Sequence, residues 1–200
     1  MRKYNFYKIS VLVVAGLLGS AMAGKTTSAV TYQSTVTPEF TINESLSVTV
    51  SSEDIAISGL TFGQSKASDA VNVTVVTNNY SGYTLTSTAG DGNAYTDTNL
   101  INSTDSSSNF TSLDTSASIA DPTNFEYCEW GYSFSTDSQA TWSNYSGLPY
   151  YDNTGATLVD KNTQSAADGD VVNFRIAAKA SETQTAGTYN NVINFAVVGK

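Results

Sequence analysis

The chain has 200 residues, with 18 Asp and Glu against 9 Lys and Arg, one Cys and no His. The absence of His excludes Ser-His and Cys-His nucleophile pairs and imidazole metal sites, so most hydrolase chemistry is not expected. The single Cys128 cannot form an internal disulfide, so a folded domain must depend on its apolar core and its hydrogen bonds.

The N-terminus has the three-part layout of a secretory signal peptide. Three basic residues precede an uncharged apolar run at residues 9–23, which ends in the small-x-small cleavage pattern Ala21-Met22-Ala23. The run is shorter than the about 20 apolar residues that span a bilayer. We therefore predict a signal peptide at residues 1–23 and a secreted, extracellular or cell-surface mature chain at residues 24–200. An uncleaved N-terminal anchor is the alternative.

Cleavage after residue 23 would leave a strongly acidic protein. Three of the basic residues leave with the signal peptide, so six remain against 18 acidic residues, a net charge of −12. Such a surface repels nucleic acid and anionic lipid headgroups. Neither is expected as a partner.

Period-two alternation of apolar and polar residues recurs along the mature chain and predicts strands, whereas helical periodicity is nearly absent. In residues 171–179, for example, Val172, Phe174 and Ile176 face a core, and Asn173 and Arg175 face the other way. In residues 192–198 the core side consists of Ile193, Phe195 and Val197. The full set of predicted strands is 30–36, 46–50, 55–62, 71–77, 83–89, 127–134, 171–179 and 192–198.

Three local features refine this set of strands. Gly59 interrupts the alternation of its strand, as a β-bulge does. Residues 78–82 are rich in turn formers and predict a hairpin between the flanking strands, with Gly82 at a positive φ. Cys128 alternates with Trp130, which predicts that both side chains point into the core.

About eight strands in a chain of this length predict an all-β fold, an immunoglobulin-like antiparallel β-sandwich, with a closed barrel as the alternative. Residues 90–124 and 135–170 do not follow the pattern and are expected to be two long polar loops that can hold short edge strands. Neither loop contains an evident second core, so we expect a single domain at residues 24–200.

Four short blocks of the chain resemble a known group of proteins. The blocks are Val73-Thr74-Val75-Val76-Thr77-Asn78-Asn79, Ser81-Gly82-Tyr83-Thr84-Leu85, Trp130-Gly131-Tyr132-Ser133, and Ala186-Gly187-Thr188-Tyr189 with the following Val192-Ile193-Asn194-Phe195. In this order they resemble secreted bacterial Ig-like β-sandwich surface proteins, distantly similar to WxL-type cell-wall domains. The resemblance implies exposure at the cell surface and a role in attachment or envelope structure. The chain lacks a pair of Trp-x-Leu motifs, so peptidoglycan binding of the WxL kind is not implied.

The candidate ligand-binding residues are aromatic. Trp142, Tyr145, Tyr150 and Tyr151 lie in one loop and would supply flat faces on which sugars stack, provided that they are exposed in one patch. No catalytic residue, metal site or cofactor is predicted. The acidic runs at residues 91–97 and 168–170 are interpreted as turns. On a strand, Glu126 and Glu129 would point to opposite faces, which is unsuitable for a catalytic carboxylate pair.

Three classes of function remain. The first is a non-enzymatic surface-layer, appendage or attachment component, whose partner is a cell-envelope or host surface protein or glycan, or a further copy of the chain. The second is a carbohydrate-binding module that uses the loop aromatics. The third, a carboxylate-dependent glycosidase, has the least support in the sequence.

Overall fold

The computed structural model describes residues 39–90, 98–151 and 154–200. The chain divides into one unit at Met1–Thr41 and a compact unit at Ile42–Lys200. The signal peptide at residues 1–23 and the predicted strand at residues 30–36 lie outside the described residues, and so does the acidic run at residues 91–97. All the strands given below belong to the unit Ile42–Lys200.

The described residues form eleven strands, one 3₁₀ helix and no α-helix. Eight strands make one sheet, in the order β1-β3-β9-β7-β6-β5-β10, with β2 paired to the far end of β9. All neighbours are antiparallel except β6 and β7, which are parallel. The strands are β1 (Leu46–Val50), β2 (Ser65–Ala67), β3 (Val71–Thr77), β5 (Leu100–Asn102), β6 (Asn109–Ser112), β7 (Glu129–Ser135), β9 (Asp170–Lys179) and β10 (Tyr189–Asn190).

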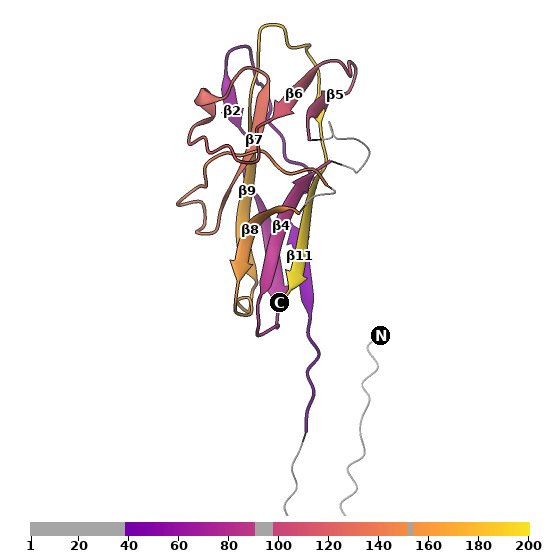
Figure 1. Cartoon of the computed structure of the whole chain (residues 1–200), viewed down its shortest axis with the longest axis vertical. Coiled ribbons are helices and arrows are strands. Elements are labelled where there is room, and N and C mark those ends of the chain that lie inside the picture. Colours follow the sequence, from indigo (N-terminus) through magenta and orange to yellow (C-terminus); the bar gives the residue numbers. More distant parts are fainter. Residues whose placement is uncertain (1–38, 91–97, 152–153) are drawn as a thin grey trace, which may run out of the picture. The chain divides into compact units, whose positions relative to one another are not determined.

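The second sheet has three strands in the order β11-β4-β8, namely β4 (Tyr83–Ala89), β8 (Ala156–Lys161) and β11 (Ile193–Gly199). The two sheets pack together as a sandwich, which confirms the predicted all-β, Ig-like class of fold. Figure 1 shows β4, β8 and β11 in the lower part of the sandwich and β2, β5 and β6 in its upper part. The small sheet therefore does not extend over the whole large sheet.

The predicted core faces of β9 and β11 are confirmed. On β9, Val172, Phe174 and Ile176 are buried, with Phe174 at 0 % exposure. The inward residues of β11 (Ile193, Phe195 and Val197) are half-buried and pack against the same cluster. Trp130 is fully buried, as predicted, and its indole Nε1 donates a hydrogen bond to the carbonyl oxygen of Thr98.

The opposite face of β9 is covered as well, although the sequence predicts a solvated face there. A second, smaller hydrophobic cluster contains Leu113, Phe125, Tyr145 and Ala177. Asn173, on the same face, is 5 % exposed. The expectation that the long polar loops carry no second core is therefore wrong, because parts of both loops fold back over the outer face of the large sheet.

Two local strand predictions are wrong. Residues 55–62 contain no strand, although Ile55, Ile57 and Leu60 pack against the core as half-buried side chains. Residues 78–82 do not close a hairpin, because β3 pairs with β1 and β9 in the large sheet whereas β4 pairs with β8 and β11 in the small sheet. The connection crosses between the sheets.

The backbone of this crossover nevertheless needs glycine, as predicted. Gly82 has a φ of +95°, and a Cβ at this position would lie 2.0 Å from the carbonyl oxygen of Lys161. Asn79 stabilises the turn by accepting a hydrogen bond from the Ser81 N–H. Gly82 thus permits both the left-handed backbone and the close approach to β8.

The two predicted long loops contain more regular structure than expected. The first holds β5, β6 and the 3₁₀ helix η1 (Pro122–Asn124), and the second holds β8. Six of the eight predicted strands are observed in the described residues, and five further strands (β2, β5, β6, β8 and β10) bring the number to eleven. They are short, or polar in composition, so alternation alone gives them a weak signal.

A polar link joins the sheets at the end opposite to β2. The carboxylate of Asp170, at the start of β9, accepts a hydrogen bond from the Tyr83 hydroxyl of β4 and forms an ion pair of 2.8 Å with Lys161 of β8. Burial alone would raise the pKa of Asp170, but the hydrogen bonds from Lys161, Ala166 N–H and Tyr83 outweigh it and hold that pKa below its usual value. Asp168-Gly169-Asp170 is thus the turn before a strand, as interpreted from the sequence.

Candidate functional site

A groove of about 830 Å³ lies on the described surface where the sandwich is open. Its floor consists of core residues of the large sheet, among them Val71, Phe110 and Ile176, together with Ile193 and Phe195 at the start of β11. A hollow of this size suits a small ligand or a few side chains of a peptide, and is too small for a folded domain.

One wall of the groove is the irregular segment that follows β1. This wall carries Ile55, Ile57, Leu60 and Phe62. Its backbone is held by the Lys66 ammonium, which donates to the carbonyl oxygen of Ser58 at 2.5 Å. No described strand pairs with this segment, so the inner face of the large sheet is covered here by irregular chain and not by a facing strand.

The other wall is the loop between β9 and β11, which is tied to β6 and the turn before it. Tyr189 packs edge-on against Phe110, with ring centroids 4.8 Å apart, and its hydroxyl lies 2.7 Å from Ser108 Oγ. Gln184 donates a hydrogen bond to the Asn109 carbonyl oxygen. These contacts hold the wall in place without any strand longer than the two residues of β10.

Cys128 lies beside this wall and not in the core, so the prediction from alternation is wrong. Its φ of +65° places it before β7 begins, so the register of β7 does not apply to it. Its Sγ lies 2.8 Å from Gln184 Oε1 and 3.1 Å from Ser181 Oγ. The thiol is partly exposed and makes polar contacts.

The charge around the groove has one sign. Glu53, Asp54 and Glu182 are the charged side chains among the described residues that line it, and none of these lining residues is Lys or Arg. An apolar floor with an acidic rim favours an uncharged or cationic occupant and disfavours fatty acids, phosphates and acidic glycans.

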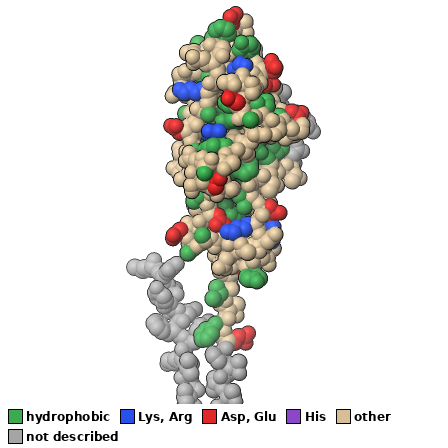
Figure 2. Space-filling model, turned by 90° about the vertical axis from the view of Figure 1, so that its left-hand side faces the viewer, with side chains coloured by type: hydrophobic (Ala, Val, Ile, Leu, Met, Phe, Trp, Pro, Cys, Tyr) green, Lys and Arg blue, Asp and Glu red, His purple; other side chains and the backbone are tan. Residues whose placement is uncertain are grey.

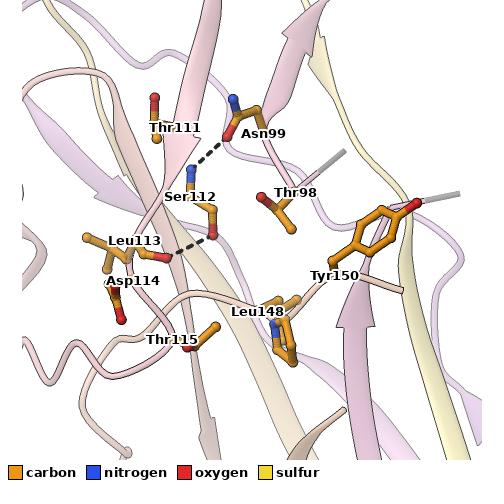
Figure 3. A pocket seen from close by; sticks show the side chains of 10 residues that line it. Thr98, Asn99, Thr111, Ser112, Leu113, Asp114, Thr115, Leu148 and Tyr150 are labelled. Carbon is orange, nitrogen blue, oxygen red and sulfur yellow. Dashed lines mark hydrogen bonds between the residues drawn. The ribbon is translucent and has the colours of Figure 1, made fainter. Parts of the chain in front are cut away.

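A second, smaller hollow of about 500 Å³ lies at the C-terminal end of β6, near Tyr150. In Figure 3 Tyr150 stands on one side, and Thr111, Ser112, Asp114 and Thr115 stand on the other. The backbone N–H of Ser112 donates to Asn99 Oδ1 at 3.1 Å. The hollow therefore offers one aromatic ring together with hydroxyl, amide and carboxylate groups.

The four candidate aromatic residues do not form one exposed patch. Tyr145 is 1 % exposed and packs edge-on against Phe125 at 5.5 Å, so burial raises the pKa of its hydroxyl. Trp142 is half-buried, with the Arg175 guanidinium 3.8 Å from the centre of its ring. Tyr150 lines the smaller hollow, and Tyr151 is 51 % exposed. The four rings therefore do not form one exposed platform on which a sugar could stack.

Several carboxylates of the described region make local hydrogen bonds. No group of three or more His, Cys, Asp or Glu side chains lies in metal-binding arrangement among the described residues. Glu129 accepts a hydrogen bond from the Glu126 N–H at 2.8 Å. Asp105, Asp114, Asp121 and Asp137 cap local turns, and hydrogen bonds from neighbouring Ser and Thr groups lower their pKa values.

The site residues that sequence reasoning missed are the groove walls. The sequence pattern predicts a strand that contains Ile55, Ile57 and Leu60, and it gives no binding role to the loop at residues 181–191. The available signal was the dense run Ser-Gly-Leu-Thr-Phe-Gly at residues 58–63, which is rich in turn formers and argues against a continuous strand.

Comparison with known proteins gives no relative: no family model, no curated protein and no solved structure matches the chain. Within the residues that the structure describes, no helix has the length and apolar character to cross a membrane. On the face shown in Figure 2, hydrophobic side chains lie in several small groups separated by polar surface. The groove is therefore the most developed candidate for a binding site.

Proposed function

We propose that this chain is a secreted, non-enzymatic component of the cell surface, structural or adhesive, that binds a protein segment in the groove between the irregular segment after β1 and the loop before β11. The observation that carries the proposal is the apolar surface left along the groove walls, where Ile55, Ile57 and Leu60 are only half-buried and Phe62 is exposed. Hydrophobic burial is the main driving force of protein association, and here it is available without unfolding the domain.

Several features support an extracellular and non-catalytic role. The N-terminal residues have the pattern of a secretory signal, and the four short blocks resemble secreted bacterial Ig-like surface proteins that are distantly WxL-like. The chain has no His, and the turn-capping aspartates keep their pKa values low, so they stay ionised and unsuited to general acid catalysis near neutral pH.

A cell-binding measurement with a matched pair of variants tests the proposal. Fluorescently labelled mature chain is incubated with source cells and with their isolated envelope, and the bound fraction is measured for Ile57→Glu and for Ser58→Glu. Ile57 lines the groove, whereas its neighbour Ser58 is exposed and does not. A charge on the apolar wall is expected to weaken binding about tenfold or more, which corresponds to about 1.4 kcal/mol.

Two results would contradict this function. Equal binding by both variants would mean that the groove is not the binding site. Recovery of the endogenous protein from the cytoplasm, with its N-terminal Met1 intact, would contradict the cell-surface location.

Glycan binding is the second candidate, now limited to the smaller hollow. Tyr150 supplies one ring for stacking, and Asp114 lies in the same lining with hydroxyl-bearing side chains. Glycan-array binding that is lost in Tyr150→Ala and kept in Tyr80→Ala would favour this function. Tyr80 is a suitable control because it is 88 % exposed and does not line the smaller hollow.

A further inference from the structure

The groove marks a place where the sandwich lacks an element. Val50 at the end of β1 and Ile193 at the start of β11 both line the groove, and β2, β5 and β6 of the large sheet lie beyond the three strands of the small sheet (Figure 1). Along its outer side, β11 pairs with no strand of the described residues. An extended segment that places alternate apolar side chains on the floor would complete the core.

The groove also restricts the charge of its occupant. Its rim carries Glu53, Asp54 and Glu182 without a compensating cation among the lining residues. A segment that carries an acidic residue at the rim would be repelled, and a charged residue at the floor would be desolvated without a partner. The occupant must therefore be neutral over the length of the groove, and a positive charge at its end would be favourable.

One stretch of this chain has that chemistry. Residues 26–38 contain no charged residue, and Lys25 immediately precedes them. Within this stretch Val30, Tyr32 and Val36 alternate with polar residues, with Ser34 completing the period of two. Pro38 ends the stretch and cannot donate a backbone hydrogen bond, which suits the end of an added strand.

We propose that residues 30–36 of a second copy of this chain occupy the groove as an extended segment, with Val30, Tyr32 and Val36 against the apolar floor and Lys25 near the acidic rim. This inference rests on the proposed function and names the protein segment that the groove takes. The same chain then supplies both the donor segment and the acceptor groove.

Such a contact is heterologous, because the donor and acceptor surfaces are different parts of the chain. A heterologous contact that does not close into a ring continues into a linear assembly. The mature protein is then expected to form chains in which each copy completes the sandwich of the next, as a structural component of a surface requires.

The first test compares charges placed on the two alternating sides of residues 30–36. Sedimentation of the mature chain is measured over an about hundredfold range of concentration, which covers a large part of a binding curve. The variant V30D/Y32D/V36D places charges toward the floor, and the matched control T31D/Q33D/T35D places the same charges on the other side. The mass of the wild type and of the control is expected to rise with concentration, while V30D/Y32D/V36D stays monomeric.

The second test uses a peptide of residues 26–38 as the probe. The acceptor is the full mature chain that carries V30D/Y32D/V36D, so that its own segment cannot compete. Titration calorimetry is expected to show binding, and binding is expected to be lost when Ile57→Glu is added and kept when Ser58→Glu is added. A peptide that carries V30D/Y32D/V36D should not bind, whereas a peptide that carries T31D/Q33D/T35D should bind like the unmodified peptide.

Each alternative gives a different result. A wild type that stays monomeric overturns the second-copy occupant, and if the peptide still binds, the groove is filled from within one chain. Equal behaviour of the two charge variants also overturns the inference. If the peptide does not bind but Ile57→Glu still weakens attachment to cells, the proposed function stands and the occupant is another protein.

Discussion

The two ends of the sandwich are closed in different ways. In the closed half, the strands β4, β8 and β11 face β1, β3 and the first part of β9, and the core residues between them include Val73, Val75 and Leu85 at 0 % exposure. In the open half, β2, β5, β6, β10 and the second part of β9 face irregular segments. In the closed half, two sheets pack regular side-chain surfaces against each other. In the open half, loops cover the core only where individual side chains reach it, and this difference produces the groove.

The largest expected effect is in the closed half. Phe174 is fully buried, stacks on Tyr132 at 5.4 Å and meets Phe195 edge-on at 5.1 Å. Phe174→Ala should lower the free energy of unfolding by ~3–5 kcal/mol, because a large cavity would be left between two sheets that cannot collapse. Urea denaturation measures this loss. The control is Val171→Ala on the same strand, which is 42 % exposed and should cost far less.

The second effect tests whether the small cluster on the outer face of β9 depends on its loops. Phe125 is 1 % exposed and contacts Tyr145 across the two long loops. Phe125→Ala should cost about 2–3 kcal/mol, below the Phe174 value, because loops relax into a cavity more easily than paired strands. Hydrogen exchange should show faster exchange at Ile119 and Tyr145, whose backbones pair with each other, and no change in β4. If Phe125→Ala speeds exchange equally in β4, the outer-face cluster and the closed half unfold as one unit.

These two predictions show where sequence reasoning succeeds. The strands at residues 46–50, 71–77 and 83–89 are predicted at their observed bounds, because each alternates against a facing sheet. Residues 55–62 alternate in part, but no neighbouring strand is present in the described region to pair with them, and pairing is a property of the whole fold.

The candidate site was less predictable than the strands. The aromatic residues Trp142 and Tyr145 occur in a polar stretch, which favours exposure, yet that stretch folds over β9 and buries Tyr145. Burial there depends on which distant residues the loop meets, and Ala177 and Phe125 are not adjacent to it in sequence. The groove itself follows from the unequal length of the two sheets, which no local pattern encodes.

The third effect concerns the polar link at the end of the closed half. Asp170→Asn removes the ion pair with Lys161 and weakens the hydrogen bond from Tyr83, and should cost about 1–2 kcal/mol at pH 7, since both charged groups are partly exposed. Since the pKa of Asp170 is lower in the folded chain than in the unfolded one, its contribution is complete above the ordinary carboxyl pKa of about 4 and is lost as the pH falls below it.

Urea midpoints of the wild type and Asp170→Asn should therefore converge as the pH falls below the ordinary carboxyl pKa, because the pKa of Asp170 is depressed in the folded chain. Asp105→Asn is the comparison from the open half: its carboxylate caps an exposed turn and its pKa is also lowered, so its midpoints should converge in the same direction by a smaller amount. A constant difference between wild type and Asp170→Asn at all pH values would show that Asp170 contributes through packing and not through its charge.

The smallest effect distinguishes the two tryptophans. Trp130, on β7, is fully buried, whereas Trp142 lies on the outer face of the large sheet with the Arg175 guanidinium 3.8 Å from its ring centre. In single-Trp variants, acrylamide should quench Trp142 more strongly than Trp130, because Trp142 keeps part of its surface in contact with solvent. Arg175→Gln should increase the quenching of Trp142, leave Trp130 unchanged and lower the free energy of unfolding by about 0.5–1 kcal/mol through loss of the cation–π contact. Equal quenching of both rings would place Trp142 inside the second cluster, and the contrast between a strand-closed core and a loop-covered face would then not hold at this position.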